Sequence, residues 1–247
     1  MAYKLIGKNF TPPDVRAKIT GKAKYAEDFK ADGMVYIKML LSPMPNANVI
    51  SMDASEALDM DGVIDILTAD DVPAPPPPAD PMLTNNPKYA GQPILAIAAV
   101  DEATAAEALE KIKITYEALP FTIDPLDSLY PGGPDVYDHI NSATRGFKTK
   151  KIKWTARDFA VAGEDKLPMG EASKEWEYGD IEAGIKNAAY IIDESFVTAS
   201  NSHHSMEPRS AFAYWENGKC HLHGSSQSQS FMMPGLSQML GIPASDI

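Results

Sequence analysis

Cysteine is almost absent from this chain, and long apolar runs are absent altogether. The 247 residues include one cysteine, Cys220, so neither an internal disulfide nor a cluster held by several cysteines can form within the chain. No run approaches the ~18 apolar residues that suggest a membrane-spanning helix. Residues 1–10 also lack the apolar centre of a signal peptide. We therefore expect no membrane span and a cytoplasmic location, with periplasmic export alongside a partner as the alternative.

Basic residues are scarce relative to acidic ones. Lys and Arg number 22 against 34 Asp and Glu, which gives a formal net charge of −12. Such a surface repels phosphate backbones and anionic membranes, so nucleic acid is not expected as a partner. Apolar residues make up 44% of the chain and charged residues 23%, as in ordinary globular proteins. The length allows one large domain or two modest ones.

The first half of the chain alternates strand-like runs with short helical patterns. Apolar or alternating residues predict β-strands over 34–41, 63–67, 93–100 and 112–118. Helices are predicted between them, one opened by a capping box at Asp53–Glu56 and one capped by Asp101. The strand, helix and strand over 93–118 predict a compact α/β unit. We interpret residues 17–125 as one α/β domain.

Residues 73–87 are rich in proline, with seven among fifteen positions. Such a run favours extended polyproline conformation over a packed element. An exposed connecting loop is the simpler interpretation, and a docking strip for a partner is the alternative. Residues 126–175 are polar and irregular, and we interpret them as a connector. The basic run 148–153 within it is expected to be solvated rather than to bind phosphate.

Residues 176–247 restart the pattern of helices and strands. The predicted elements are a helix capped by Asp180, a strand over 190–198, a hairpin of 211–215 and 219–223 that turns at Asn217-Gly218, and a helix from Pro234 to Leu240 that Gly241 ends. Another helix start follows just before residue 247, so this segment looks like the beginning of a longer domain.

Two groups of residues in this last segment are candidates for binding a metal ion or another ligand. His203, His204, His221 and His223 lie close together in sequence, near Cys220, and a His-x-His pair on a strand can bind zinc or copper. Cys220 lies in a predicted strand, where cysteine usually packs as a small apolar residue. The polar run 224–230 follows a strand and precedes a helix, where α/β folds present backbone and side-chain groups to ligands.

Several short motifs, in order, resemble those of the molybdenum hydroxylase large subunit, the family of xanthine dehydrogenase and aldehyde oxidase. They are G-x-A-x-Y-x-x-D at Gly21–Asp28, Tyr178-Gly-Asp180, H-x-x-M-E-P at His203–Pro208 with the strand residues Ala213-Tyr-Trp215 after it, Ser225-Ser-Gln227, and Met239-Leu-Gly-Ile-Pro243. The resemblance runs from about residue 5 to residue 247. Each motif is weak alone, and their shared order makes the resemblance specific.

The resemblance implies an α+β fold with an a/b hammerhead domain at 17–125, a connector at 126–175 and the beginning of a mixed α/β molybdopterin-binding domain at 176–247. It implies a molybdenum–molybdopterin cofactor, as its cytosine dinucleotide form. Such enzymes hydroxylate an aldehyde or N-heterocyclic carbon with oxygen from water. Electrons then pass to 2Fe–2S centres and FAD. No domain for these groups precedes residue 1, so we expect iron–sulfur and FAD partner subunits, as in the bacterial arrangement.

The resemblance also assigns residues. The glutamine matching Gln227 lies beside the apical oxo group of molybdenum in the family, and Ser226 is a weaker candidate for cofactor binding. Glu207 and His204 are expected to be structural, with the carboxylate capping backbone donors. The family's catalytic glutamate and a glycine-rich loop are expected beyond Ile247. No catalytic residue is therefore expected in this chain, and we expect it to be inactive without the remainder of the subunit.

Other functions remain open at this point. Related members of the family dehydroxylate an acyl-CoA or oxidise carbon monoxide. A non-catalytic interaction module would dock through the proline strip 73–87. A small metal-binding protein would use the His221, His223 and Cys220 group.

Overall fold

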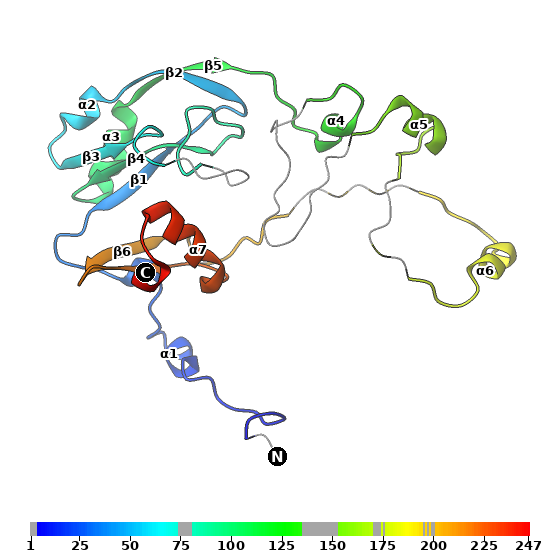
Figure 1. The fold of residues 1–247 in the computed structure, drawn as a ribbon, viewed down its shortest axis with the longest axis horizontal. Helices are drawn as coiled ribbons and strands as arrows, with labels where there is room; N and C mark the ends of the chain where they lie inside the picture. The colour runs from blue at the N-terminus through cyan, green and yellow to red at the C-terminus, as the bar shows by residue number, and fades with distance from the viewer. Residues whose placement is uncertain are drawn as a thin grey trace.

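The computed structural model describes residues 4–73, 81–134, 153–169, 174, 176–194, 196, 198 and 201–247. The helices are α1 (Val15–Ile19), η1 (Ala26–Asp28), α2 (Ser55–Leu58), α3 (Glu102–Lys111), α4 (Pro125–Leu129), α5 (Ala156–Ala162), α6 (Ile181–Asn187), α7 (Gln229–Leu240) and η3 (Ala244–Asp246). The strands are β1 (Tyr36–Leu41), β2 (Ala47–Asp53), β3 (Val63–Leu67), β4 (Pro93–Ala99), β5 (Lys113–Ala118), β6 (Ala211–Glu216) and β7 (Lys219–Gly224). Figure 1 shows β1–β5 with α2 and α3 gathered as one body, beside which the β6–β7 hairpin and α7 lie.

The N-terminal body is built on the antiparallel sheet β1-β4-β3. Its central strand β4 is apolar along its length, and Ile94, Leu95 and Ile97 are completely buried, as a strand covered on both sides should be. The buried core joins Ile97 to alanines of α2 and α3. Because alanine is small, these helices can approach the sheet closely. The predicted strands over 34–41, 63–67 and 93–100 are confirmed.

A second, two-stranded sheet pairs β2 with β5 in antiparallel register. The strand predicted over 112–118 is thus confirmed, but it does not lie beside β4, because the two belong to different sheets. The chain between Pro45 and Asp53 carries no clear alternation, so sequence reasoning missed β2. Its residues become a strand only because β5 supplies the hydrogen-bonding partner.

Local helix signals were correct in one case and wrong in another. The Asp101 carboxylate accepts a hydrogen bond from the Thr104 backbone N–H at 2.7 Å, so the predicted cap of α3 is confirmed. The capping box at Asp53–Glu56 is wrong. Asp53 accepts from the backbone N–H and the hydroxyl of Ser55 instead, at 3.0 and 2.6 Å. Glu56 forms an ion pair with Lys113 of β5, which explains why its carboxylate does not turn back to the helix start.

The proline strip falls partly outside the described residues, which omit 74–80. Its end is packed rather than exposed, since Leu83, Thr84 and Pro87 are all buried. The Thr84 N–H donates to the Pro93 carbonyl at 3.1 Å, and the Pro87 carbonyl accepts from the Ala47 N–H at 3.0 Å. The expectation of an exposed loop is therefore wrong at these three buried residues, whereas Met82 and Asn86 are exposed as expected.

The predicted connector contains more structure than its polar composition suggested. Between α4 and α5, the rings of Tyr130, Trp154 and Phe159 contact one another, with centroids 5.1 to 5.9 Å apart. Lys153 donates to the carbonyls of Ser128 and Gly133. It therefore satisfies backbone acceptors, while the rest of the basic run, 148–152, lies outside the described residues.

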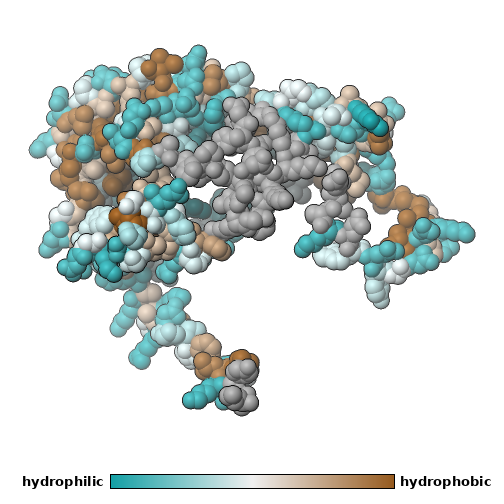
Figure 2. All heavy atoms as spheres, in the orientation of Figure 1, coloured by the Kyte–Doolittle hydropathy of each residue, from teal (hydrophilic) through white to brown (hydrophobic). Residues whose placement is uncertain are grey.

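The strand predicted over residues 190–198 is wrong for every residue there that the structure describes. Tyr190 and Ile192 are 91% and 82% exposed, and Phe196 is 87% exposed. A strand needs a neighbour to accept and donate its backbone hydrogen bonds, and no described strand pairs with this segment. Apolar atoms are visible along the arm that carries α6, and they also gather on the N-terminal body (Figure 2). The α6 cap is confirmed, with the Asp180 carboxylate accepting from the Ala183 N–H at 2.8 Å.

The hairpin prediction is confirmed. Strands β6 and β7 pair in antiparallel register around Asn217 and Gly218, both of which have positive φ, 51° and 76°. This is the turn that Asn-Gly favours, because its twist matches the twist of the flanking strands.

The following helix, α7, begins earlier than predicted. It starts at Gln229, and Pro234 lies in its interior rather than in its first turn. A proline there has no N–H to donate, so the helix lacks one backbone hydrogen bond at this position. Gly241 ends the helix in the left-handed region, as expected. In the described part of the chain, no helix has the length and apolar character that crossing a membrane requires.

Candidate functional site

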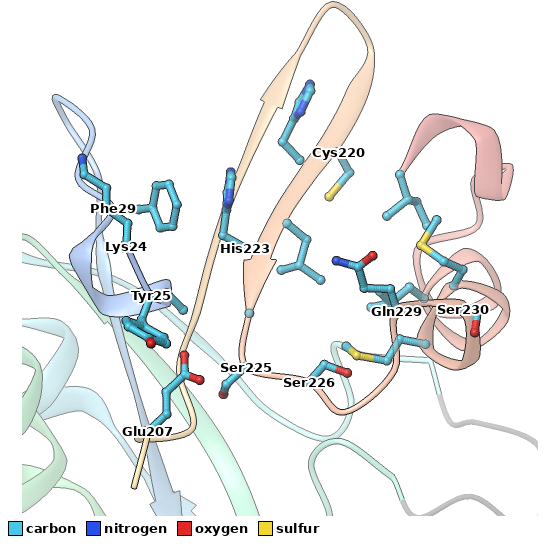
Figure 3. Close-up of a pocket in the computed structure, with 18 residues that line it drawn as sticks. Lys24, Tyr25, Phe29, Glu207, Cys220, His223, Ser225, Ser226, Gln229 and Ser230 are labelled. Carbon is cyan, nitrogen blue, oxygen red and sulfur yellow. The ribbon is translucent and has the colours of Figure 1, made fainter. Parts of the chain in front are cut away.

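A cavity of about 880 Å³ lies between the segment Lys24–Phe29, strand β7 and helix α7. Figure 3 shows its three walls, with Tyr25 and Phe29 on one side of the hairpin and Gln229 and Ser230 on the other. Ser225 and Ser226 lie along the rim between them. The G-x-A-x-Y-x-x-D motif and the serine- and glutamine-rich run 224–230 are distant in sequence, and the fold brings them to one cavity.

The first wall is a tight turn closed by Asp28. The Tyr25 backbone N–H donates to the Asp28 carboxylate at 2.9 Å, and the Asp28 N–H donates to the Tyr25 carbonyl at 3.0 Å. This reciprocal bonding satisfies donors that the start of a helical turn leaves free. Ala26 is buried beneath the turn. The turn therefore has a fixed shape, and it directs Phe29 toward the hairpin.

Aromatic rings join this turn to the hairpin. The Phe29 ring stacks on His223 with centroids 4.2 Å apart, and it lies 6.2 Å from the ring of Phe212. On the same hairpin face, Tyr214 stacks on His221 at 4.8 Å. The cavity wall is thus a row of planar side chains from two distant parts of the sequence.

The positions of His221, His223 and Cys220 bear on whether they could bind a metal ion together. His221 and His223 do share one face of β7, as predicted, but both rings stack on aromatic neighbours. Cys220 is buried and free, and Figure 3 shows it on the side of α7. Within the part of the chain that the structure describes, no group of three His, Cys, Asp or Glu side chains is placed to hold a metal ion.

The second wall is the polar loop, which we define as residues 224–228. Its start is hydrogen-bonded to the segment that precedes β6. The Ser225 N–H donates to the Ser210 carbonyl at 3.3 Å, and the Ser225 hydroxyl donates to the Pro208 carbonyl at 3.4 Å. The Ser226 hydroxyl accepts from the Ser228 N–H at 3.2 Å, so its own O–H can still donate to a ligand.

The two glutamines near this loop differ in position. Gln227 is exposed and does not line the cavity, whereas Gln229, at the first position of α7, does. Ser226, the weaker candidate, lines it as well. Sequence reasoning overlooked Gln229, although the repeat Gln227-Ser228-Gln229 was a usable signal. A motif ending in glutamine can be matched to this run in two registers.

Glu207 connects the cavity to a second one of about 530 Å³, because it lines both. The second cavity also contains Glu27, Asp28 and Ser210, and the Ser210 hydroxyl oxygen is buried without a partner. In the described structure, the Glu207 carboxylate accepts no hydrogen bond, so the expectation that it caps backbone donors is not met. The H-x-x-M-E-P segment therefore faces the Y-x-x-D turn across this second cavity.

The fold and the site together define a chain with a hammerhead-type body followed by the start of a cofactor-binding domain. Residues 20–120 match the sequence model of the aldehyde oxidase and xanthine dehydrogenase a/b hammerhead domain. Residues 164–247 match that of the molybdopterin cofactor-binding domain. The chain belongs to the molybdenum hydroxylase family of xanthine dehydrogenases and aldehyde oxidases. Neither the metal-binding nor the interaction-module alternative is favoured.

Individual relatives agree with this assignment. The chain is 25% identical to the nicotinate dehydrogenase large molybdopterin subunit of Eubacterium barkeri, over 99% of this chain and 53% of that protein. It is 28% identical to the xanthine dehydrogenase molybdenum-binding subunit of Escherichia coli, over 76% of this chain and 27% of that protein. The chain thus spans between about a quarter and about half of the length of these relatives.

A solved structure shows the same fold. The quinoline 2-oxidoreductase of Pseudomonas putida 86 superposes on the whole of this chain with a TM-score of 0.70, at 20% identity, and the match covers 30% of that protein. The predicted α+β fold, a hammerhead domain followed by the start of a molybdopterin-binding domain, is therefore confirmed.

The residues of the cavity fit one wall of a molybdopterin site. Small side chains in the polar loop let a ligand approach the backbone, and the hydroxyl of Ser226 and the amide of Gln229 offer hydrogen-bond donors at the rim. Such donors suit the oxo and pterin groups of that cofactor. Met232, Met233 and Leu236 of α7 line the same cavity and give it an apolar surface.

Proposed function

We propose that this chain is the N-terminal part of the molybdopterin-binding subunit of an oxidoreductase that hydroxylates an aldehyde or N-heterocyclic carbon. The convergence of three family motifs on adjoining cavities is the observation that carries the proposal: the Tyr25–Asp28 turn, the Ser205–Pro208 segment and the polar loop. The reaction is R–H + H₂O → R–OH + 2H⁺ + 2e⁻. When bound, the molybdenum centre would supply the transfer of oxygen from water and take up the two electrons.

This chain's own residues would hold and orient the cofactor from one side. The Gln227 amide is proposed to donate to the apical oxo group, and Ser226 to assist through its O–H. Gln229, which lines the cavity, is a second candidate donor. No residue of the chain is assigned as the catalytic base, and the glutamate of the family is proposed to belong to polypeptide that follows Ile247.

The remaining assignments follow from the family. We propose the cytosine dinucleotide form of the cofactor, iron–sulfur and FAD partner subunits, the remainder of the molybdopterin subunit as a further partner, and a cytoplasmic complex. The proposed domains are 17–125 and 176–247, with a connector at 126–175. The two family matches, 20–120 and 164–247, support this division, although the second begins inside the connector.

The experiment that tests this function is elemental analysis of the complex purified from its natural source. About one molybdenum per copy of this chain, together with iron, is the expected result. Stoichiometric zinc or copper without molybdenum would instead support the histidine group, and the family's chemistry would then not apply to this protein. Flavin fluorescence after denaturation of the same sample checks the proposed FAD subunit separately.

A further inference from the structure

Phe29 lies where the Lys24–Phe29 wall of the cavity contacts strand β7. Its ring packs on His223 at 4.2 Å on one side, and the Lys24 ammonium lies 5.9 Å from its centroid. Phe29 is also the residue directly after the Asp28-closed turn. The hydrogen bonds that hold this turn therefore also fix the position of the ring that contacts His223.

His223 in turn lies at the point where the polar loop begins. It pairs with Phe212 across the hairpin, and Gly224, the last residue of β7, pairs with Ala211. Ser225 then leaves the strand and is tied to the Ser210 carbonyl. The start of the loop is thus held from two sides, by β6 through backbone pairing and by Phe29 through ring stacking.

We propose that Phe29 is a positioning residue that fixes the polar loop for cofactor binding through its stack on His223. The inference rests on the proposed function, because the loop is taken to face the molybdenum cofactor. Phe29 does not itself need to touch the cofactor. Asp28 acts together with Phe29, because its carboxylate closes the turn that holds the Phe29 ring against His223.

The first test measures the loop directly, by hydrogen exchange of the purified complex followed by mass spectrometry. Phe29→Ala should raise the exchange rate of peptide amides in residues 224–230, while Phe29→Tyr, which keeps a ring, should not. Phe10→Ala is the matched control, because Phe10 is 66% exposed and has no ring contact with the hairpin. Unchanged exchange over 224–230 in Phe29→Ala would overturn the proposal.

The second test measures molybdenum per chain in the same variants. Phe29→Ala should reduce it roughly 2- to 10-fold, the factor that corresponds to one aromatic pair. Ile97→Val is the control for general destabilisation, because it weakens the core of the N-terminal body without touching the cavity. An equal loss of molybdenum in Ile97→Val would show that general destabilisation explains the effect of Phe29→Ala. That result would contradict the positioning role.

Double variants separate positioning from simple stability. Asp28 and Phe29 are proposed to act through the same contact, the stack of Phe29 on His223. The double variant Asp28→Ala, Phe29→Ala should therefore lose little more molybdenum than Phe29→Ala alone. Asp28→Asn keeps an acceptor oxygen and should lose less than Asp28→Ala. Fully additive losses would contradict the proposal. If the wild-type complex contains no molybdenum, the proposed function fails, whereas raised loop exchange in Phe29→Ala would still support the positional role of Phe29.

Discussion

Asp101 and Thr104 form the hydrogen bond that starts helix α3, with the carboxylate oxygen 2.7 Å from the backbone nitrogen. The bond favours the ionised acid, and it holds the pKa of the Asp101 carboxyl below its ordinary value of 3.8. A carboxyl whose pKa is lower in the folded state stabilises the fold above its unfolded pKa. That stabilisation is lost as the pH falls through the folded value.

The first prediction follows from this bond. Asp101→Asn should fold about as well as the wild type at neutral pH, because asparagine is also a good N-cap. It should lose less stability than the wild type when the pH falls below about 4, because it has no carboxyl to protonate. Thermal unfolding of both proteins across the acid range measures the difference. If the melting temperatures of the two proteins fall in parallel as the pH is lowered, Asp101 makes no contribution to acid sensitivity.

The second prediction concerns the core of the N-terminal body. Ile97 is completely buried against Ala57, Ala105 and Ala108, so Ile97→Ala leaves a cavity between sheet and helices. We expect it to lower the free energy of unfolding by about 2–5 kcal/mol. Denaturant unfolding provides the measurement. Ile37→Ala is the control on a neighbouring strand, where the side chain is 65% exposed, and it should change the stability by less than about 0.5 kcal/mol.

The third prediction tests the hairpin turn. Gly218 has a φ of 76°, where a side chain is strained, so Gly218→Ala should destabilise the protein by about 1–2 kcal/mol. Asn217→Gly, at the other positive-φ position, should be close to neutral. Because the hairpin forms one wall of the cavity, Gly218→Ala should also lower the molybdenum content. An unaltered melting temperature in Gly218→Ala would contradict the turn assignment.

The fourth prediction addresses the two glutamines. Loss of a hydrogen-bond donor aimed at the reacting centre typically lowers kcat by about 10²–10³-fold. We expect such a loss in Gln227→Ala, with the fold intact by circular dichroism, when kcat is measured in the complete complex. Retained activity in Gln227→Ala together with a large loss in Gln229→Ala would assign the role to the glutamine that lines the cavity. Phe10→Ala, at an exposed residue that does not line the cavity, is the control.

Local signals predicted local structure well. Asn217-Gly218, the Asp101 cap and Gly241 each depend on the conformational preferences of a few neighbouring residues, and all three were correct. Pro234 was misleading because the helix begins five residues before it, at Gln229, so that the proline lies in the helix interior. The β2 strand had no such local signal, since its formation depends on pairing with β5.

The family motifs were recognised without any indication of how they meet in space. That Phe29 stacks on His223 could not be predicted, because no periodicity relates residues so far apart. Gln229 was missed for a different reason: the repeated Gln-Ser pattern fits the motif in two registers, and only the geometry distinguishes them. The segment 190–198 has strand-forming residues, yet composition cannot supply the partner strand that it requires.

The cavity has walls from residues 24–29 and from residues 220–247, which places a constraint on the order of events in biosynthesis. During translation, the N-terminal body can fold from its own residues, but the cavity acquires its second wall only after β7 and α7 have left the ribosome. Closing so long a loop carries an entropic cost that the aromatic contact helps to offset. Cofactor insertion at this cavity must therefore wait until α7 has left the ribosome and packed beside the hairpin.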